Sequence, residues 1–184
     1  MNYPWYKIVH GDEIKQGDII ENCPVFYVPE ELALDSTEIE RQEFEIGFEE
    51  RNVIVLSQTC DMVKNQESIS DVLLCAIWLR TEITEGKMSK NENWENARKG
   101  RFPGFHVLNK CDLSSYKRDY RMVDFRRIYS LPLNWFRKKV SESGDRIRLL
   151  PPYREHLSQA FARFFMRVGL PVDIKSFTQT QRPK

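Results

Sequence analysis

The chain has 184 residues, of which 41% are hydrophobic and 30% are charged. This balance excludes an intrinsically disordered chain, and the length suits a single domain. No apolar run approaches the roughly 20 residues that a membrane-spanning helix requires, and the first residues lack the basic-then-apolar pattern of a signal peptide. We therefore expect a cytoplasmic protein without a membrane partner.

The net charge of +1 hides a difference between the two halves of the chain. Residues 1–80 contain six Lys/Arg and sixteen Asp/Glu, a net of −10, whereas residues 81–184 contain twenty-two and eleven, a net of +11. A basic surface formed by the second half would bind phosphate, and an acidic surface formed by the first half would bind a basic partner. The alternative is that the halves interleave in space and neutralise each other.

Short strands dominate the predicted secondary structure. Their apolar residues either alternate with polar ones, which is typical of a half-buried strand, or run continuously, as in a strand buried on both faces. The predicted strands cover residues 19–20, 25–28, 44–48, 53–56, 72–79, 105–108, 120–125 and 147–150. Pro24 and Pro29 place the second of these at a sheet edge, and Arg51-Asn52 is predicted as a turn before the fourth.

Residues 84–101 interrupt this pattern with a predicted short helix. Ser89 followed by Glu92 has the spacing of a capping box, and Trp94 follows at helical spacing. Further along, residues 129–136 contain Leu-Pro-Leu and are predicted as a turn anchored by Trp135.

A longer amphipathic helix is predicted to follow Pro152, a residue that suits the first helical position. Its apolar face contains Tyr153, Leu157, Ala160, Phe161, Phe164, Phe165 and Val168. Gly169 is expected to end the helix with a left-handed cap. We expect this face to dock on the sheet or on a partner.

Together these elements predict a mainly β fold. We expect a small, highly bent antiparallel sheet or β-barrel with an inserted short helix and a C-terminal amphipathic helix. The predicted single domain spans residues 1–176, with the helical insertion at about 84–101 and a flexible tail over 177–184.

The strand over 53–56 runs into a cluster of polar and reactive side chains, Ser57, Thr59, Cys60 and Asp61. Cys60 would be a nucleophile beside Asp61, and His106 is the histidine best placed to activate it. The alternative is structural: Ser57 and Thr59 bond to backbone groups, Asp61 caps the turn and Cys60 packs beneath it.

The spacing of the four cysteines matches no zinc-binding pattern, so no metal site or other cofactor is assigned. An alternative set of ligands is Cys60, His106 and Cys111 with Asp61 or Asp112. These are acceptable ligand types, although no two have the sequence spacing of a known site.

Basic residues alternate with aromatic ones in the second half of the chain. Arginine and lysine bind phosphates, and aromatic rings stack on exposed bases. The candidate nucleic-acid contacts are Arg98, Lys99, Arg101, Lys117, Arg118, Arg121, Arg126 and Arg127. The alternative is that the aromatic residues are core and the charges form a solvated face.

The order of elements resembles the PemK/MazF-like group of bacterial proteins. The likeness rests on Gly17-Asp18-Ile19, on Arg51 before the strand 53–56 with Ser57 at its end, on the apolar strand 72–77, and on the helix after Pro152. It covers about two thirds of the chain. The resemblance implies an enlarged, divergent SH3-like barrel and RNA as its ligand, in the setting of a toxin-antitoxin or defence system.

The same resemblance implies ribonuclease chemistry, in which Arg51 would stand beside the scissile phosphate. Asn52 follows it where the family has Pro, and Trp78 stands where the family has Thr or Ser, with Thr81 three residues on. The predicted catalytic set is Arg51, Ser57, Thr59, Cys60 and Asp61.

Three functions follow as hypotheses. The first is a nucleic-acid-binding protein, with toxin-type endoribonuclease activity as its catalytic form. The second is a non-catalytic interaction or sensor module with a protein partner or a second copy of itself. The third is a thiol- or metal-dependent enzyme centred on Cys60.

Overall fold

Seven antiparallel strands form one sheet in this computed structural model, which describes residues 3–27 and 47–166. The order is β1-β7-β2-β3-β4-β6-β5, and the sheet is not closed. The strands are β1 (Tyr6–Val9), β2 (Asp18–Tyr27), β3 (Gly47–Val55), β4 (Asp71–Leu79), β5 (Phe105–Leu108), β6 (Arg121–Pro132) and β7 (Arg146–Leu149). The helices are α1 (Asn91–Arg98), α2 (Leu133–Glu142) and α3 (Tyr153–Phe165). The predicted mainly β fold with a bent sheet and added helices is confirmed.

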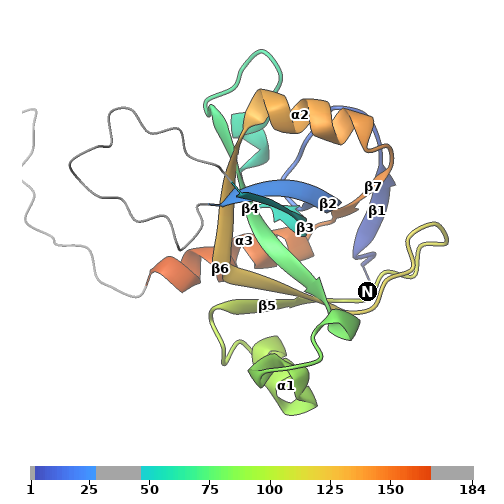
Figure 1. The fold of residues 1–184 in the computed structure, drawn as a ribbon, viewed down its shortest axis with the longest axis vertical. Coiled ribbons are helices and arrows are strands. Elements are labelled where there is room, and N and C mark those ends of the chain that lie inside the picture. The colour runs from blue at the N-terminus through green and yellow to red at the C-terminus, as the bar shows by residue number, and fades with distance from the viewer. Residues whose placement is uncertain (1–2, 28–46, 167–184) are drawn as a thin grey trace, which may run out of the picture.

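The two faces of the sheet are buried by different helices (Figure 1). In β3, Ile54 belongs to the core cluster that includes Leu157 of α3. Its neighbours Val53 and Val55 point the other way, into a cluster with Phe136 of α2. This alternation follows from the period of two in a strand, and it explains why residues 53–56 read as continuously apolar.

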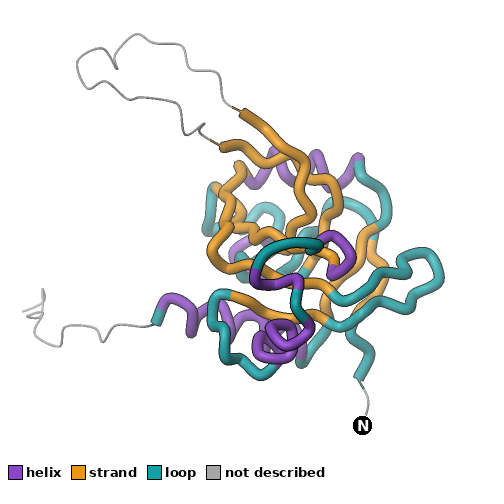
Figure 2. Tube along the Cα trace, turned by 60° about the horizontal axis from the view of Figure 1, so that its bottom comes forward, coloured by secondary structure: helices purple, strands orange, loops and turns teal. Residues whose placement is uncertain are grey.

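A third, smaller cluster lies under α1, beside the end of the sheet formed by β5 and β6. Trp94 and Ala97 of α1 pack there against Met122 of β6. The indole N–H of Trp94 donates a hydrogen bond of 2.6 Å to the Met88 carbonyl. Figure 2 shows this helix and α3 on the same side of the molecule as β5.

The inserted helix is shorter than predicted. Residues 84–101 contain the 3₁₀ turn η4 (Lys87–Ser89) and then α1 (Asn91–Arg98). The predicted capping box is wrong, since the helix begins after Lys90 and the Ser89 hydroxyl donates to the Gly86 carbonyl at 2.8 Å instead.

The turn predicted over 129–136 is also wrong. β6 continues to Pro132, and α2 begins at Leu133. Proline ends the strand because it has no N–H to donate, and it is well suited to precede a helix. Phe136 is the buried anchor, whereas Trp135 is 37% exposed and lies 5.9 Å from the ring of Phe26.

Residues around Arg51 form one long strand rather than a turn and a strand. β3 runs from Gly47 to Val55 and includes Arg51 and Asn52, so the predicted turn is wrong. Residues 44–46 of the predicted alternating strand lie outside the described residues. The edge character of 25–27 is confirmed, because this part of β2 pairs with β3, while pairing with β7 involves Asp18 and Ile19.

α3 confirms the predicted amphipathic helix and docks on the sheet. Leu157 is fully buried, and Tyr153, Ala160, Phe161 and Phe164 pack against the same cluster. Phe165 differs from the prediction, because it is 57% exposed. The predicted cap at Gly169 and the predicted tail over 177–184 lie outside the described residues. None of the helices in residues 3–27 and 47–166 is long and apolar enough to cross a membrane.

Acidic residues of the first half pair with basic residues of the second. Asp18 is fully buried, with its carboxylate bound by Arg146 at 2.9 Å and by Arg148 at 2.9 Å. Glu21 accepts hydrogen bonds from Arg118 and Arg121. At these positions the halves do interleave and neutralise each other.

Candidate nucleic-acid interface

One face of the sheet brings arginines and aromatic rings together. Arg51 of β3 lies with its guanidinium carbon 5.0 Å from the ring centre of Trp78 on β4, and that of Arg127 on β6 lies 5.9 Å away. Both distances fall within the range of a cation–π interaction. Adjacent strands β3, β4 and β6 thus place two cations around one half-buried indole.

A groove of about 370 Å³ extends from this ring; we call it the Trp78 groove. Besides Trp78 and Arg127 it is lined by Phe105, Asp124 and Arg126, and by Glu82, Ile83, Thr84, Glu85, Met88 and Met122. The guanidinium of Arg126 stands 4.3 Å from the ring centre of Phe105. The groove therefore contains a second pair of arginine and aromatic ring.

The carboxylates near the arginines are largely engaged. Glu49 accepts a hydrogen bond from Arg51, which holds the pKa of that carboxyl below its usual value and raises the pKa of the guanidinium. Asp124 binds Arg126 through two hydrogen bonds of 2.8 Å. Each pair is two residues apart on one strand, so both side chains share a face.

Arg51 keeps some hydrogen-bonding capacity in this arrangement. Its Nε is buried and has no hydrogen-bond partner within the described part of the chain. Glu85, by contrast, is an exposed carboxylate in the lining of the groove. The lining of the groove thus contains two arginines and three carboxylates, of which Asp124 binds Arg126 and Glu82 accepts a hydrogen bond of 2.7 Å from the Leu79 backbone.

The other predicted basic contacts are distributed over three places. Arg98 and Lys99 are exposed at the end of α1, where both bind Glu95, at 2.7 and 3.0 Å. Arg101 follows and donates to the Asn96 side chain. Lys117 is exposed on the loop between β5 and β6.

Arg118 and Arg121 are not a free basic surface. Arg118 binds Glu21 through both oxygens, at 3.0 and 2.8 Å. Arg121 is only 1% exposed and also bonds to Glu21, at 3.3 Å. The prediction of Arg121 as a surface contact is therefore wrong, because its guanidinium is buried and pairs with Glu21 inside the protein.

The predicted catalytic cluster after β3 consists of side chains with structural partners. The Ser57 hydroxyl accepts a hydrogen bond of 2.8 Å from the Leu73 backbone, and Thr59 accepts one from the Gln16 backbone at 3.2 Å. Asp61 accepts one from Ser68 at 2.9 Å. These contacts fit the structural interpretation of the turn η2 (Thr59–Met62).

Cys60 is exposed rather than packed beneath the turn, and its thiol contacts Asp61 at 3.6 Å. It lines a hollow with Arg154 and Ser158 of α3, whereas His106 lines a different cavity. The predicted pairing of Cys60 with His106 is therefore not formed.

The alternative metal site is not assembled either. Cys111 is buried in a bridge to Arg118, away from the hollow that Cys60 lines. Within residues 3–27 and 47–166, no three His, Cys, Asp or Glu side chains are grouped so that they could hold a metal ion.

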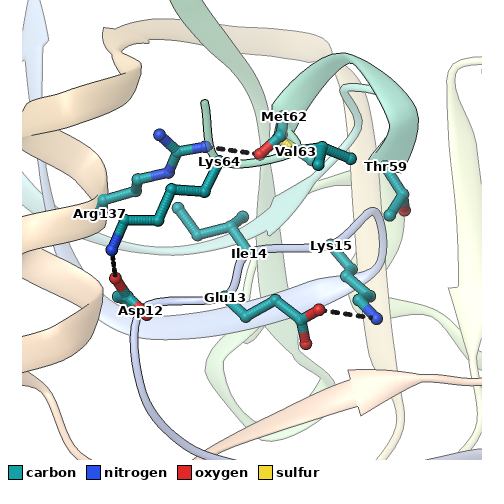
Figure 3. A pocket seen from close by; sticks show the side chains of 9 residues that line it. All are labelled: Asp12, Glu13, Ile14, Lys15, Thr59, Met62, Val63, Lys64 and Arg137. Carbon is teal, nitrogen blue, oxygen red and sulfur yellow. Dashed lines mark hydrogen bonds and ion pairs between the residues drawn. The ribbon is translucent and has the colours of Figure 1, made fainter. Parts of the chain in front are cut away.

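A neighbouring pocket shows how the turn η2 is held in place (Figure 3). Arg137 of α2 donates to the Met62 carbonyl and forms an ion pair with Glu67. Lys64 binds Asp12 at 2.8 Å across the same pocket. Figure 3 shows Thr59 at the rim, apart from these charges. The charged groups of this pocket are thus paired within the chain, Lys64 and Asp12 at its surface, rather than free for catalysis.

Arg51 and the cluster from Ser57 to Asp61 are not brought into one site. Arg51 belongs to the Trp78 side of the sheet, while the cluster lies beyond the end of β3, beside α2 and α3. Sequence reasoning missed Phe105 and Asp124 as members of the groove. The spacing of Asp124 and Arg126 on one strand was a usable signal for their pairing.

Comparison of the chain with protein-family models, with curated proteins and with solved structures finds no match.

Proposed function

We propose that the Trp78 groove binds single-stranded nucleic acid, with RNA as the first ligand to test. The observation that carries this proposal is the placement of Arg51 and Arg127 around the ring of Trp78. The resemblance to PemK/MazF-like proteins points to the same class of ligand.

The proposed mode of binding uses stacking and charge together. Exposed bases stack on aromatic rings and on guanidinium planes, and this works for any base because each has a π face. Arg126 and Arg127 are exposed in the middle of β6, where phosphates would approach from solvent. Sheet surfaces with aromatic and basic side chains are a recurrent platform for single strands.

Binding without cleavage is the function proposed. Cleavage through the 2′-hydroxyl requires an acid or base and a cation at one phosphate. The predicted catalytic residues are divided between Arg51, beside the Trp78 ring, and the cluster from Ser57 to Asp61, in which three of the four side chains are engaged with structural partners.

The test is fluorescence anisotropy with a labelled single-stranded RNA of mixed sequence at low salt, in the wild type and three variants. We expect Trp78→Leu to weaken binding about tenfold, since stacking of one base contributes ~1–3 kcal/mol. Arg127→Gln is expected to weaken it severalfold and to reduce the salt slope by about 0.7. Lys7→Gln removes the same charge from an exposed position on β1, at the opposite end of the sheet, and serves as the control.

Glu85→Gln separates a nucleic acid from a basic protein as the ligand. Removing a carboxylate beside bound phosphates is expected to tighten RNA binding severalfold, whereas a basic partner would bind more weakly. The absence of RNA binding at low salt, or equal affinity of Trp78→Leu and wild type, would exclude the proposal. The length of the RNA, followed in parallel with Arg51→Ala, reports any cleavage.

A further inference from the structure

A second cavity, of about 440 Å³, lies on the other side of the edge strand β5. We call it the His106 cavity; its polar lining consists of Arg98, Lys99, His106, His156, Gln159 and Arg163. These residues come from the end of α1, from β5 and from α3. Figure 1 and Figure 2 both show β5 close to these two helices. Phe105 is the residue that this cavity shares with the Trp78 groove.

Positive charge in the His106 cavity is not balanced by its own lining, which contains no carboxylate. Glu95, just outside, binds both Arg98 and Lys99 and fixes their positions. Arg163 is exposed, and within the described part of the chain it has no ion pair. Three cations against one carboxylate leave a net positive potential in the cavity.

The two histidines add hydrogen-bond donors to this potential. Burial, together with the nearby His156, lowers the pKa of His106 to about 4, so its imidazole is neutral at physiological pH. The ring lies 6.3 Å from that of Phe125, and His156 stands edge-on to Tyr153 at 6.2 Å. Neither imidazole has a hydrogen bond to another described residue. The neutral ring of His106 still carries one N–H donor, and the ring of His156 carries at least one.

We propose that the His106 cavity binds a phosphate group. A phosphate offers several acceptor oxygens and negative charge, and the cavity offers Arg163, two imidazoles and the Gln159 amide around a partly apolar floor. The volume suits a ligand of nucleotide size. The phosphate comes either from a free nucleotide or from the end of a strand that crosses β5 from the Trp78 groove.

Nuclear magnetic resonance of the imidazole C–H groups tests this directly, because the chain has only 3 histidines. The probes are inorganic phosphate, a nucleoside 5′-monophosphate, and one RNA trinucleotide with and without a 5′-phosphate. We expect phosphate and the monophosphate to shift the signals of His106 and His156 and to raise the pKa of His106. His10, whose side chain is 85% exposed and outside the cavity, is the internal control.

Arg163→Gln is expected to weaken binding of the monophosphate about tenfold, since it removes a charge from the cavity on an exposed part of α3. Lys7→Gln removes the same charge on β1, at the opposite end of the sheet, and should bind like the wild type. Thermal unfolding of both variants checks that the fold is unchanged.

The trinucleotides distinguish the two sources of phosphate. A tighter response to the phosphorylated trinucleotide than to the free monophosphate identifies a strand end, and the reverse identifies a free nucleotide. If no probe moves the signals of His106 and His156, or if Arg163→Gln and Lys7→Gln bind alike, the proposal is overturned. A failure of the Trp78 groove to bind RNA leaves the responses to phosphate and monophosphate unaffected, so the two proposals fail separately.

Discussion

Asp18 shows how one residue can connect distant parts of the chain. It follows Gly17, whose φ of +85° and close approach to Leu149 leave little room for a side chain. The carboxylate of Asp18 then forms ion pairs with two arginines of β7 that are each 4% exposed. The Gly-Asp-Ile sequence that contributed to the family resemblance therefore has a structural use in this chain.

Asp18→Asn is expected to lower the free energy of unfolding by about 3–5 kcal/mol, because it removes the only buried carboxylate that the described residues place beside two buried guanidinium groups and leaves only the exposed Glu13, 3.7 Å from Arg148. Denaturation by urea measures the change. Asp12→Asn is the control: Asp12 pairs with Lys64 at the surface, and its loss should leave stability nearly unchanged. Equal stability of the two variants would show that the buried ion pairs contribute little.

The residue types of the candidate interface were predictable, but their exposure was not. Arg121 and Arg127 both stand in basic, aromatic stretches, yet Arg121 is 1% exposed and Arg127 lies at the surface. Exposure depends on where β6 passes Glu21 of β2, and that contact joins positions 100 residues apart. No local pattern contains this information.

At the scale of elements, strands with a continuous apolar run were predicted well, as in β4 and the second half of β3. β1 was missed because it has only four residues, and these are held in a strand by pairing with the distant β7. α2 was missed because Leu-Pro-Leu signals a turn, although Leu133, Phe136 and Val140 have helical spacing. The turn signal of Leu-Pro-Leu and the helical spacing of the apolar residues overlap here, and the helix forms because its apolar residues pack in the core.

α3 allows a matched comparison of two residues on one helix. Leu157→Ala is expected to destabilise the protein by about 3 kcal/mol, because it opens a cavity where the side chain is fully buried. Phe165→Ala, at a position 57% exposed, should cost much less. Urea denaturation with an unchanged m-value measures both. A larger loss for Phe165 would indicate that this end of the helix is covered in solution.

The stability of the whole molecule is expected to depend on His106 in mild acid. Because burial holds the pKa of His106 at about 4, against 6.5 in the unfolded chain, the unfolded state takes up the proton first as pH falls. Stability should therefore decrease between about pH 6.5 and about pH 5, by ~1.5 kcal/mol from this group.

His106→Asn should remove that part of the pH dependence, whereas His10→Asn, at an exposed site, should retain it. Unfolding by urea at several pH values gives the comparison. Parallel curves for the wild type and His106→Asn would contradict a depressed pKa at this position.

The sheet order has a consequence for the time at which the protein can fold during its synthesis. β1 and β2 both pair with β7, in a register that joins Tyr6 to Leu149 and Asp18 to Arg148. β1 must therefore wait for almost the whole described chain before its partner strand exists, whereas β2 can pair first with β3 and gains β7 only at that late stage. Such distant pairing is typical of slow folding, and the early strands are exposed to other proteins for that interval.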